Sequence, residues 1–152
     1  MNMNTRRLFS ILGAFLILVP AVKSAEDLRL NPRLDYSSDS QDGPLITGSD
    51  MQAGAVSGKP NYIIIYGEGC FNSKRQARRT VNLYEKYRGR VNFVVIDLDR
   101  KRSPKQQDLL AKYYKGYIPH VVLLDQRQSP LYNHSGEVEE AQIARLLDSA
   151  LR

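Results

Sequence analysis

The sequence predicts an α/β domain built on a four-stranded mixed β-sheet with helices on both faces. Over residues 59–152, short β-branched runs alternate with longer segments of helical periodicity, in the order β-α-β-α-β-β-α. The first two strands are joined through a helix and should therefore be parallel. The last two are close enough in the chain to form an antiparallel hairpin.

The first half of this pattern starts with residues 62–66, a continuous β-branched and aromatic run that is typical of a strand buried on both faces. A Gly-Glu-Gly segment interrupts the run. Asn72 or Ser73 is then expected to cap a helix that continues to about Arg88 and ends at Gly89.

The second half repeats the alternation. Residues 91–96 predict another buried strand, and Ser103 with Pro104 form a good N-cap and first turn for a helix that runs to Lys115. The remaining elements are expected as a strand at 120–124, a weak strand at 130–133 and a closing helix at 137–151.

The first 25 residues are expected to be a signal peptide rather than part of the core. Arg6 and Arg7 form a basic region, and the apolar run at 8–19 is too short for a stable membrane anchor. The protein is then periplasmic or secreted with no stable anchor after cleavage, while an uncleaved anchor is the alternative. Thr5 to Phe9, with Lys23 near the cleavage site, resembles a twin-arginine signal, so the sequence leaves the twin-arginine and the general secretory routes both open.

Residues 26–58 are rich in Ser, Asp, Gly and Pro and show no apolar periodicity. They predict a linker or a loosely packed N-terminal arm, in which residues 33–36 or 45–47 are candidate edge strands. The domain itself is expected at 59–152.

Charge and cysteine content limit the function classes. Removing Arg6, Arg7 and Lys23 with the signal peptide lowers the formal net charge from +6 to +3, which is too weak to indicate a nucleic-acid partner. The chain has one cysteine, so it has no internal disulfide, and an exported lone cysteine is either inert and buried or available to partners.

Three segments carry a family resemblance: Cys70-Phe71-Asn72-Ser73 after the first strand, Asp97-Leu98-Asp99 after the second, and Ile118-Pro119-His120 before the third. In this order and spacing they resemble the thioredoxin superfamily. The resemblance implies a thioredoxin-like fold, an attacking thiol at Cys70 and a cis proline at Pro119 that packs against it.

The departures from the family's pattern change the expected chemistry. Ser73 stands where redox-active members carry the second, resolving cysteine, and Ile64 stands where thioredoxin has a buried aspartate. Gly69 replaces the aromatic residue that commonly precedes the first cysteine. The resemblance therefore implies a monothiol variant that lacks intramolecular dithiol chemistry.

Several residues are candidates for tuning the thiol. The start of a helix favours a thiolate, and Lys74 and Arg75, with Arg78 and Arg79 beyond them, add positive potential. His120 is a candidate base, and Glu68 opposes the basic residues. The alternatives are that the basic side chains form a solvated helix face and that His120 lies at the surface at a strand end.

Two functions are compatible with these residues. In the first, Cys70 exchanges or forms mixed disulfides with partner proteins and an external thiol reductant releases it. In the second, the domain is a non-catalytic, chaperone-like binding module that holds an extended peptide around Phe71, Ile118 and Pro119. No cofactor is expected, and no metal site is either, because Cys70, His120 and His134 lack the spacing of metal ligands. A peroxidase is disfavoured because no accompanying signature is present.

Overall fold

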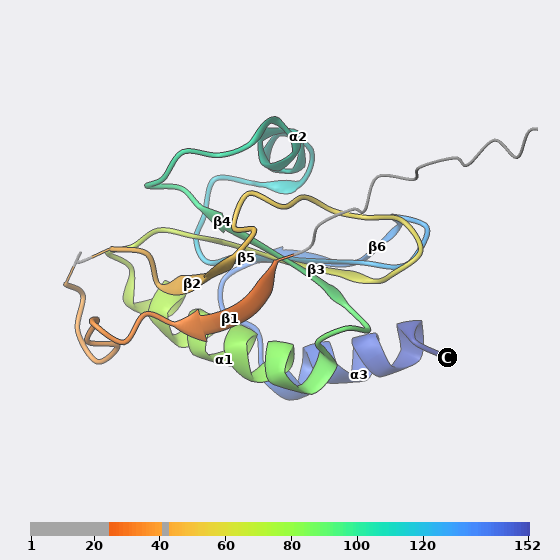
Figure 1. Ribbon diagram of the computed structural model, residues 1–152, viewed down its shortest axis with the longest axis horizontal. Helices are drawn as coiled ribbons and strands as arrows, with labels where there is room; N and C mark the ends of the chain where they lie inside the picture. The colour runs from red at the N-terminus through yellow and green to blue at the C-terminus, as the bar shows by residue number, and fades with distance from the viewer. Residues whose placement is uncertain (1–24, 41–42) are drawn as a thin grey trace, which may run out of the picture.

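The computed structural model describes residues 25–40 and 43–152 (Figure 1). Except for Ala25, the predicted signal peptide lies outside the described residues. Within the described part of the chain, the helices are all too short or too polar to cross a membrane.

The main sheet has four strands in the spatial order β4-β3-β5-β6. Strands β3 and β4 are parallel, whereas β5 is antiparallel to both β3 and β6. This is the mixed sheet that the sequence predicts, and the strands are β3 (Asn61–Tyr66), β4 (Asn92–Asp97), β5 (His120–Leu124) and β6 (Pro130–Ser135).

Helices cover both faces of the sheet, with α1 and α3 on one face and α2 on the other (Figure 1). Alternate residues of β3 pack into two separate clusters: Tyr62 and Ile64 face α1 and α3, and Ile63 and Ile65 face α2. This explains why the first predicted strand is continuously apolar. The helices are α1 (Phe71–Tyr87), α2 (Pro104–Tyr113) and α3 (Glu140–Ala150).

The two helix starts differ in how they are capped. Helix α2 begins as predicted, because the Ser103 hydroxyl accepts from the backbone N–H of Gln106 in a capping box with Pro104 in the first turn. Helix α1 begins two or three residues earlier than predicted. Its N-cap is Cys70, without a side-chain cap, so neither Asn72 nor Ser73 has the expected role.

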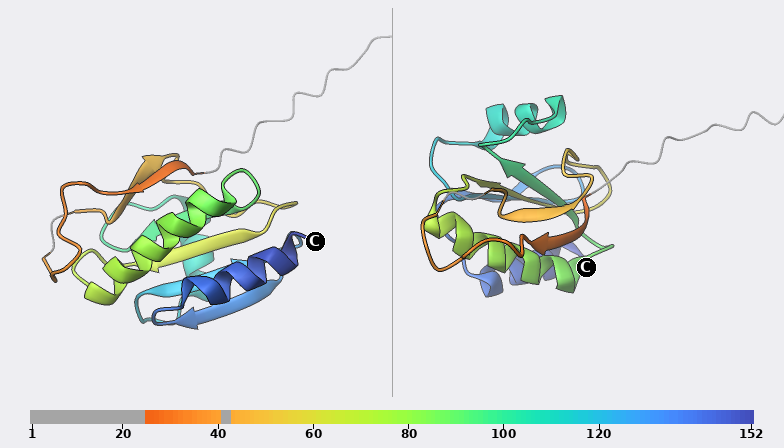
Figure 2. Two further views of the ribbon diagram at one scale, coloured as in Figure 1. Left: turned by 90° about the horizontal axis from the view of Figure 1, so that it is seen from below. Right: turned by 60° about the vertical axis from the view of Figure 1, so that its left-hand side comes forward.

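The segment expected to be a linker or loosely packed arm is instead built into the domain. Strands β1 (Glu26–Leu30) and β2 (Ile46–Ser49) pair antiparallel in a sheet of their own that lies beside α1 (Figure 2). Leu28, Leu45 and Ile46 are buried in the same cluster as β3. The strand expected near 45–47 is therefore present as β2, but it pairs with β1 and does not extend the main sheet.

Candidate functional site

Cys70 lies where the chain passes from β3 to α1. Its side chain is partly exposed, its backbone N–H donates to the carbonyl of Gly67 (3.4 Å), and its carbonyl accepts from the N–H of Lys74 (3.0 Å). The thiol therefore stands at the N-terminus of a 17-residue helix. The residue as a whole is partly open to solvent.

The segment before β5 packs against this turn. The Ile118–Pro119 peptide bond is cis, and the Pro119 carbonyl accepts from the N–H of Gly136 (2.7 Å). A Cβ atom on Gly67 would lie 2.6 Å from Cδ1 of Ile118, so the isoleucine side chain would have to move to admit it. The turn of Cys70 and the loop of Pro119 therefore lie close together at Gly67.

Exposed aromatic side chains flank the same turn. Phe71 is 37% exposed and Tyr117 is 74% exposed, and Ile118 between Tyr117 and Pro119 is half-buried. Phe71 and Ile118 are predicted from the sequence as partner-binding residues, whereas Tyr117 is not. The sequence does contain a signal for Tyr117 as a surface residue near the site. It directly precedes the Ile-Pro pair and is not part of the apolar pattern of any helix or strand.

Ser73 points into the protein. Its side chain is fully buried, and among the described residues its Oγ atom has no hydrogen-bond partner. A hydroxyl in this place is chemically inert toward a disulfide, and it is not exposed together with the Cys70 thiol.

Lys74, a predicted tuning residue, is directed toward the N-terminal arm. Its side chain is fully buried, and its Nζ atom donates to the carbonyls of Asp35 (2.9 Å), Ser38 (2.5 Å) and Ser40 (2.8 Å). Because these acceptors belong to the segment between β1 and β2, the positive charge holds the arm on α1.

Arg75 also has a different partner from the expected one. Its guanidinium pairs with Glu137, donates to Asn72 (3.2 Å) and stacks over the ring of Phe71 (5.1 Å). Arg79 binds Glu137 and the neighbouring Glu139. The basic residues thus mainly connect α1 to the segment before α3.

His120 is fully buried, which contradicts the expectation of a surface position at a strand end. Its two ring nitrogens lie 2.8 Å from Ser135 Oγ and 2.7 Å from Asn133 Oδ1, both on β6. Burial lowers the pKa of the imidazole. With both nitrogens bonded to the neighbouring strand, His120 links β5 to β6 and is not arranged as a base for Cys70.

Several solved structures resemble the overall fold of this chain. A thioredoxin-like protein from Clostridium perfringens is 24% identical, with a TM-score of 0.52 over 63% of this chain and 74% of its own. The thioredoxin-2 of the malaria parasite secretion machinery is 19% identical, with a TM-score of 0.50 over 60% and 82%. Another malarial protein is 19% identical, with a TM-score of 0.51 over 62% and 99%. The chain has a thioredoxin-like fold. No protein-family model and no curated protein matches it.

In this thioredoxin-like fold an acidic residue, Glu68, lies two residues before Cys70. Glu68 is buried, pairs with Arg100 (2.6 Å) and donates its backbone N–H to Asp99 (2.8 Å). Because Arg100 neutralises it, Glu68 opposes a thiolate at Cys70 less than its position in the sequence indicates.

Asp97, at the end of β4, is a second buried acid in this thioredoxin-like domain. Burial raises its pKa to about 6, and the nearby Glu68 carboxylate adds to the shift. Burial also raises the pKa of the neighbouring Tyr66, whose hydroxyl accepts from the backbone N–H groups of Leu45 (3.1 Å) and Ile46 (3.3 Å). In the sequence Asp97 is noted only as part of the Asp97-Leu98-Asp99 segment, and nothing in the sequence predicts that its side chain is buried.

Within residues 25–40 and 43–152, no three His, Cys, Asp or Glu side chains come together as a metal site.

Proposed function

We propose that the protein is an exported monothiol exchange protein that reacts with disulfides of partner proteins through Cys70. The Cys70 thiolate attacks one sulfur of a partner disulfide R–S–S–R′. A new disulfide forms between Cys70 and R, the partner's S–S bond breaks, and R′ leaves as a thiolate that takes up a proton.

Release then needs a second thiol from outside the domain. A low-molecular-weight thiol R″–SH, as its thiolate, attacks the R sulfur of the mixed disulfide, forms R–S–S–R″ and returns the Cys70 thiolate. The two steps exchange one disulfide for another without net oxidation. An internal release is excluded, because Ser73 cannot form a disulfide.

One observation carries the proposal: the chain's single thiol is accessible at the start of α1, whereas the hydroxyl at the resolving position is buried. The positive end of the helix dipole favours an anion at Cys70. Phe71 and Tyr117 provide exposed apolar surface for a partner peptide beside the thiol.

The proposed site of action is the periplasm or the extracellular space, reached through the signal peptide predicted at residues 1–25. Partner disulfides form and persist in these compartments. We expect the mature protein to act free of the membrane, with a small thiol as the external reductant.

Mixed-disulfide formation with a disulfide-linked peptide tests the proposal, with reduced glutathione added in a second step. We expect mass spectrometry to show the adduct at Cys70, with a rate at least about tenfold above that of the same chain unfolded in urea. Glutathione should then release the peptide. Equal rates for folded and unfolded chains would contradict an exchange function.

Two variants serve as controls in this assay. Cys70→Ser should form no adduct, and Ser73→Ala should react as the natural protein does, because its hydroxyl has no part in the exchange. A large loss of reactivity in a folded Ser73→Ala variant would show that the hydroxyl takes part and that our mechanism is wrong.

A peptide-binding module without turnover is the second candidate function. It is favoured by His120, whose two ring nitrogens are bonded to β6, so that His120 is not available as a base for Cys70. Affinity capture with the natural protein and with Cys70→Ala separates the candidates. Partners lost with the thiol favour exchange, and partners kept by both proteins favour the binding module.

A further inference from the structure

Ser135, His120 and Asn133 form a hydrogen-bonded group where β5 and β6 pair. His120 Nδ1 lies 2.8 Å from Ser135 Oγ, and His120 Nε2 lies 2.7 Å from Asn133 Oδ1. The imidazole is fully buried, whereas Ser135 is exposed. An exposed serine is thus bonded to a buried base, and the base is bonded to a third side chain. Acyl-transfer enzymes arrange a nucleophile, its base and the group that orients the base in this way.

The amide oxygen of Asn133 determines which ring nitrogen of His120 carries the proton. Because this oxygen can only accept a hydrogen bond, Nε2 donates to it. In the neutral ring Nδ1 is then an acceptor, and the Ser135 hydroxyl donates to it. Burial lowers the pKa of His120, and the nearby Lys115 and His134 lower it further. The ring is therefore neutral at neutral pH, in the form that accepts a proton from the serine.

The backbone of Ser135 provides a donor for the other reacting atom. The N–H of Gly136 donates to the carbonyl of Pro119 (2.7 Å), and Ser135 is opposite His120 in the register of β5 and β6. Hydrogen-bonded and non-hydrogen-bonded pairs alternate in an antiparallel ladder, so the N–H of Ser135 is directed away from β5. Among the described strands β6 is the last of the main sheet, so this N–H is directed toward the sheet edge. There it can donate to the oxyanion that forms when the hydroxyl attacks a carbonyl group.

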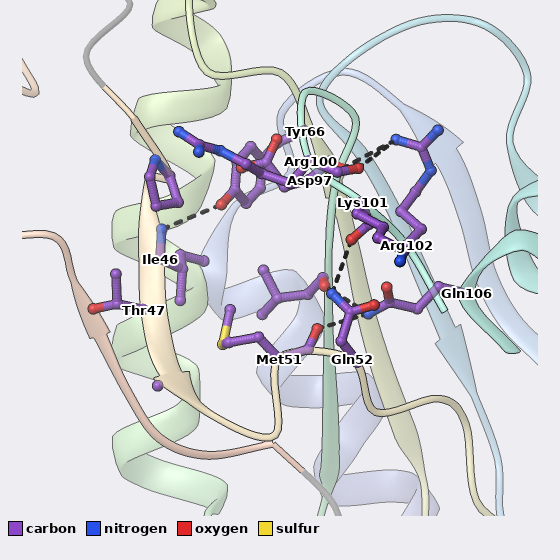
Figure 3. Close-up of a pocket in the computed structure, with 13 residues that line it drawn as sticks. Ile46, Thr47, Met51, Gln52, Tyr66, Asp97, Arg100, Lys101, Arg102 and Gln106 are labelled. Carbon is purple, nitrogen blue, oxygen red and sulfur yellow. Dashed lines mark hydrogen bonds between the residues drawn. The ribbon is translucent and has the colours of Figure 1, made fainter. Parts of the chain in front are cut away.

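The group of Ser135 is separate from the cavity of about 300 Å³ between β2 and the connection from β4 to α2 (Figure 3). The lining of that cavity contains no residue of β5 or β6. Ser135 instead lies at the edge of the main sheet, where a substrate is held less tightly than in an enclosed site. This position favours a small and reactive acyl group as the substrate.

We propose that Ser135 is the nucleophile of a site that hydrolyses small carboxylic esters, with His120 as its base and Asn133 as the residue that positions the base. Ser135 Oγ attacks the ester carbonyl and its proton passes to His120 Nδ1. The C–O bond to the alcohol breaks, and the alcohol leaves with that proton. Water then attacks the acyl-serine and gives a proton to Nδ1, the carboxylic acid leaves, and Ser135 Oγ takes that proton back. The site does not use Cys70, so its test is independent of the exchange function.

Labelling with a fluorophosphonate, which forms a covalent bond with activated serine hydroxyl groups, tests the proposal. The mature protein carries Cys70→Ser in this test, because a thiol also takes up acyl groups. We expect mass spectrometry to show labelling of Ser135 at least about 100-fold faster than labelling of Ser129, an exposed serine directly before the same strand. Acetyl-Ser135 should likewise form from p-nitrophenyl acetate. Equal labelling of the two serines, or none at Ser135, would overturn the proposal.

The role of the base distinguishes an activated serine from one that is merely accessible. The labelling rate of Ser135 should rise with pH through the lowered pKa of His120 and stay level above it. Asn133→Ala, if circular dichroism shows it to be folded, should slow labelling at least about tenfold, and Ser129→Ala should leave the rate at Ser135 unchanged. A rate that rises continuously up to about pH 9 would show that Ser135 reacts without His120 and would overturn the proposal, whether or not Asn133→Ala folds.

Discussion

Lys74→Met removes the buried charge that holds the arm on α1. The ammonium group donates to three carbonyls of the β1–β2 connection at 2.5–2.9 Å, and the lysine side chain is fully buried. Methionine keeps most of the apolar stem and deletes the donor. The variant therefore isolates the hydrogen bonds from the packing.

The expected loss follows from two opposing contributions. Hydrogen bonds from a charged donor contribute about 1.5–3 kcal/mol each, so three contribute roughly 5–9 kcal/mol. Burying the ammonium costs several kcal/mol in the natural protein, a cost that methionine does not have. We expect the free energy of unfolding to fall by about 2–4 kcal/mol, because the carbonyls can regain water if the loop opens.

Urea unfolding and amide hydrogen exchange measure the effect. A loss of about 3 kcal/mol lowers the urea midpoint by about 1–3 M when m is about 1–3 kcal/mol/M. Protection should be lost first in residues 34–40. The matched control Lys86→Met, at an exposed position of the same helix, should change the free energy of unfolding by no more than about 0.5 kcal/mol. A Lys74→Met midpoint equal to that of the natural protein would refute the reasoning.

Three further predictions concern other parts of the domain. Because the folded state raises the pKa of Asp97 from 3.8 to about 6, it binds the proton more tightly than the unfolded state, and stability falls as pH rises from about 4 to 6. The pKa shift corresponds to at most about 3 kcal/mol, and solvent screening reduces it to about half. We therefore expect Asp97→Asn to be about 1–2 kcal/mol more stable than the natural protein at pH 7. Urea unfolding at several pH values should show a smaller loss of stability between about pH 4 and 6 in the variant. Gly48→Ala should lower the thermal midpoint, with a loss of about 1–3 kcal/mol, because its Cβ would lie 2.6 Å from the carbonyl oxygen of Glu26. Arg75→Ala should leave the rate of Cys70 alkylation unchanged and cost less than about 1 kcal/mol, since its ion pair is exposed; a clear change in that rate would restore Arg75 as a tuning residue.

The elements of the main sheet could be predicted from the sequence because each has a local signal. The strand expected at 120–124 has those bounds in the structure, and the capping box at Ser103 follows from two side chains three residues apart. In the arm the sequence indicates only a short candidate strand at 45–47, and nothing in it predicts that the arm packs into the core. Leu28, Leu45 and Ile46 are too widely separated to form a periodic stripe, and they meet only because β1 and β2 pair over a connection of 15 residues, 31–45.

The candidate site divides in the same way. Cys70 and Pro119 could be placed from order and spacing, and the structure brings their segments together at Gly67. The roles of Lys74 and His120 could not be predicted, because a charged side chain in a sequence does not identify its partner. The carbonyls that hold Lys74 lie 34 to 39 residues away, and the hydrogen-bond partners of His120 belong to the next strand.

These partners also bear on the chemistry at Cys70. Lys74, Arg75 and His120 are the candidates for activating the thiol that the sequence indicates, and each is bonded to a different part of the fold. Under the proposed exchange function, we expect the helix terminus to favour the thiolate, and it acts through backbone groups that no side-chain substitution removes. Reactivity that survives substitution of all three side chains, but falls when the folded chain is unfolded in urea, would therefore assign the activation of Cys70 to the fold itself.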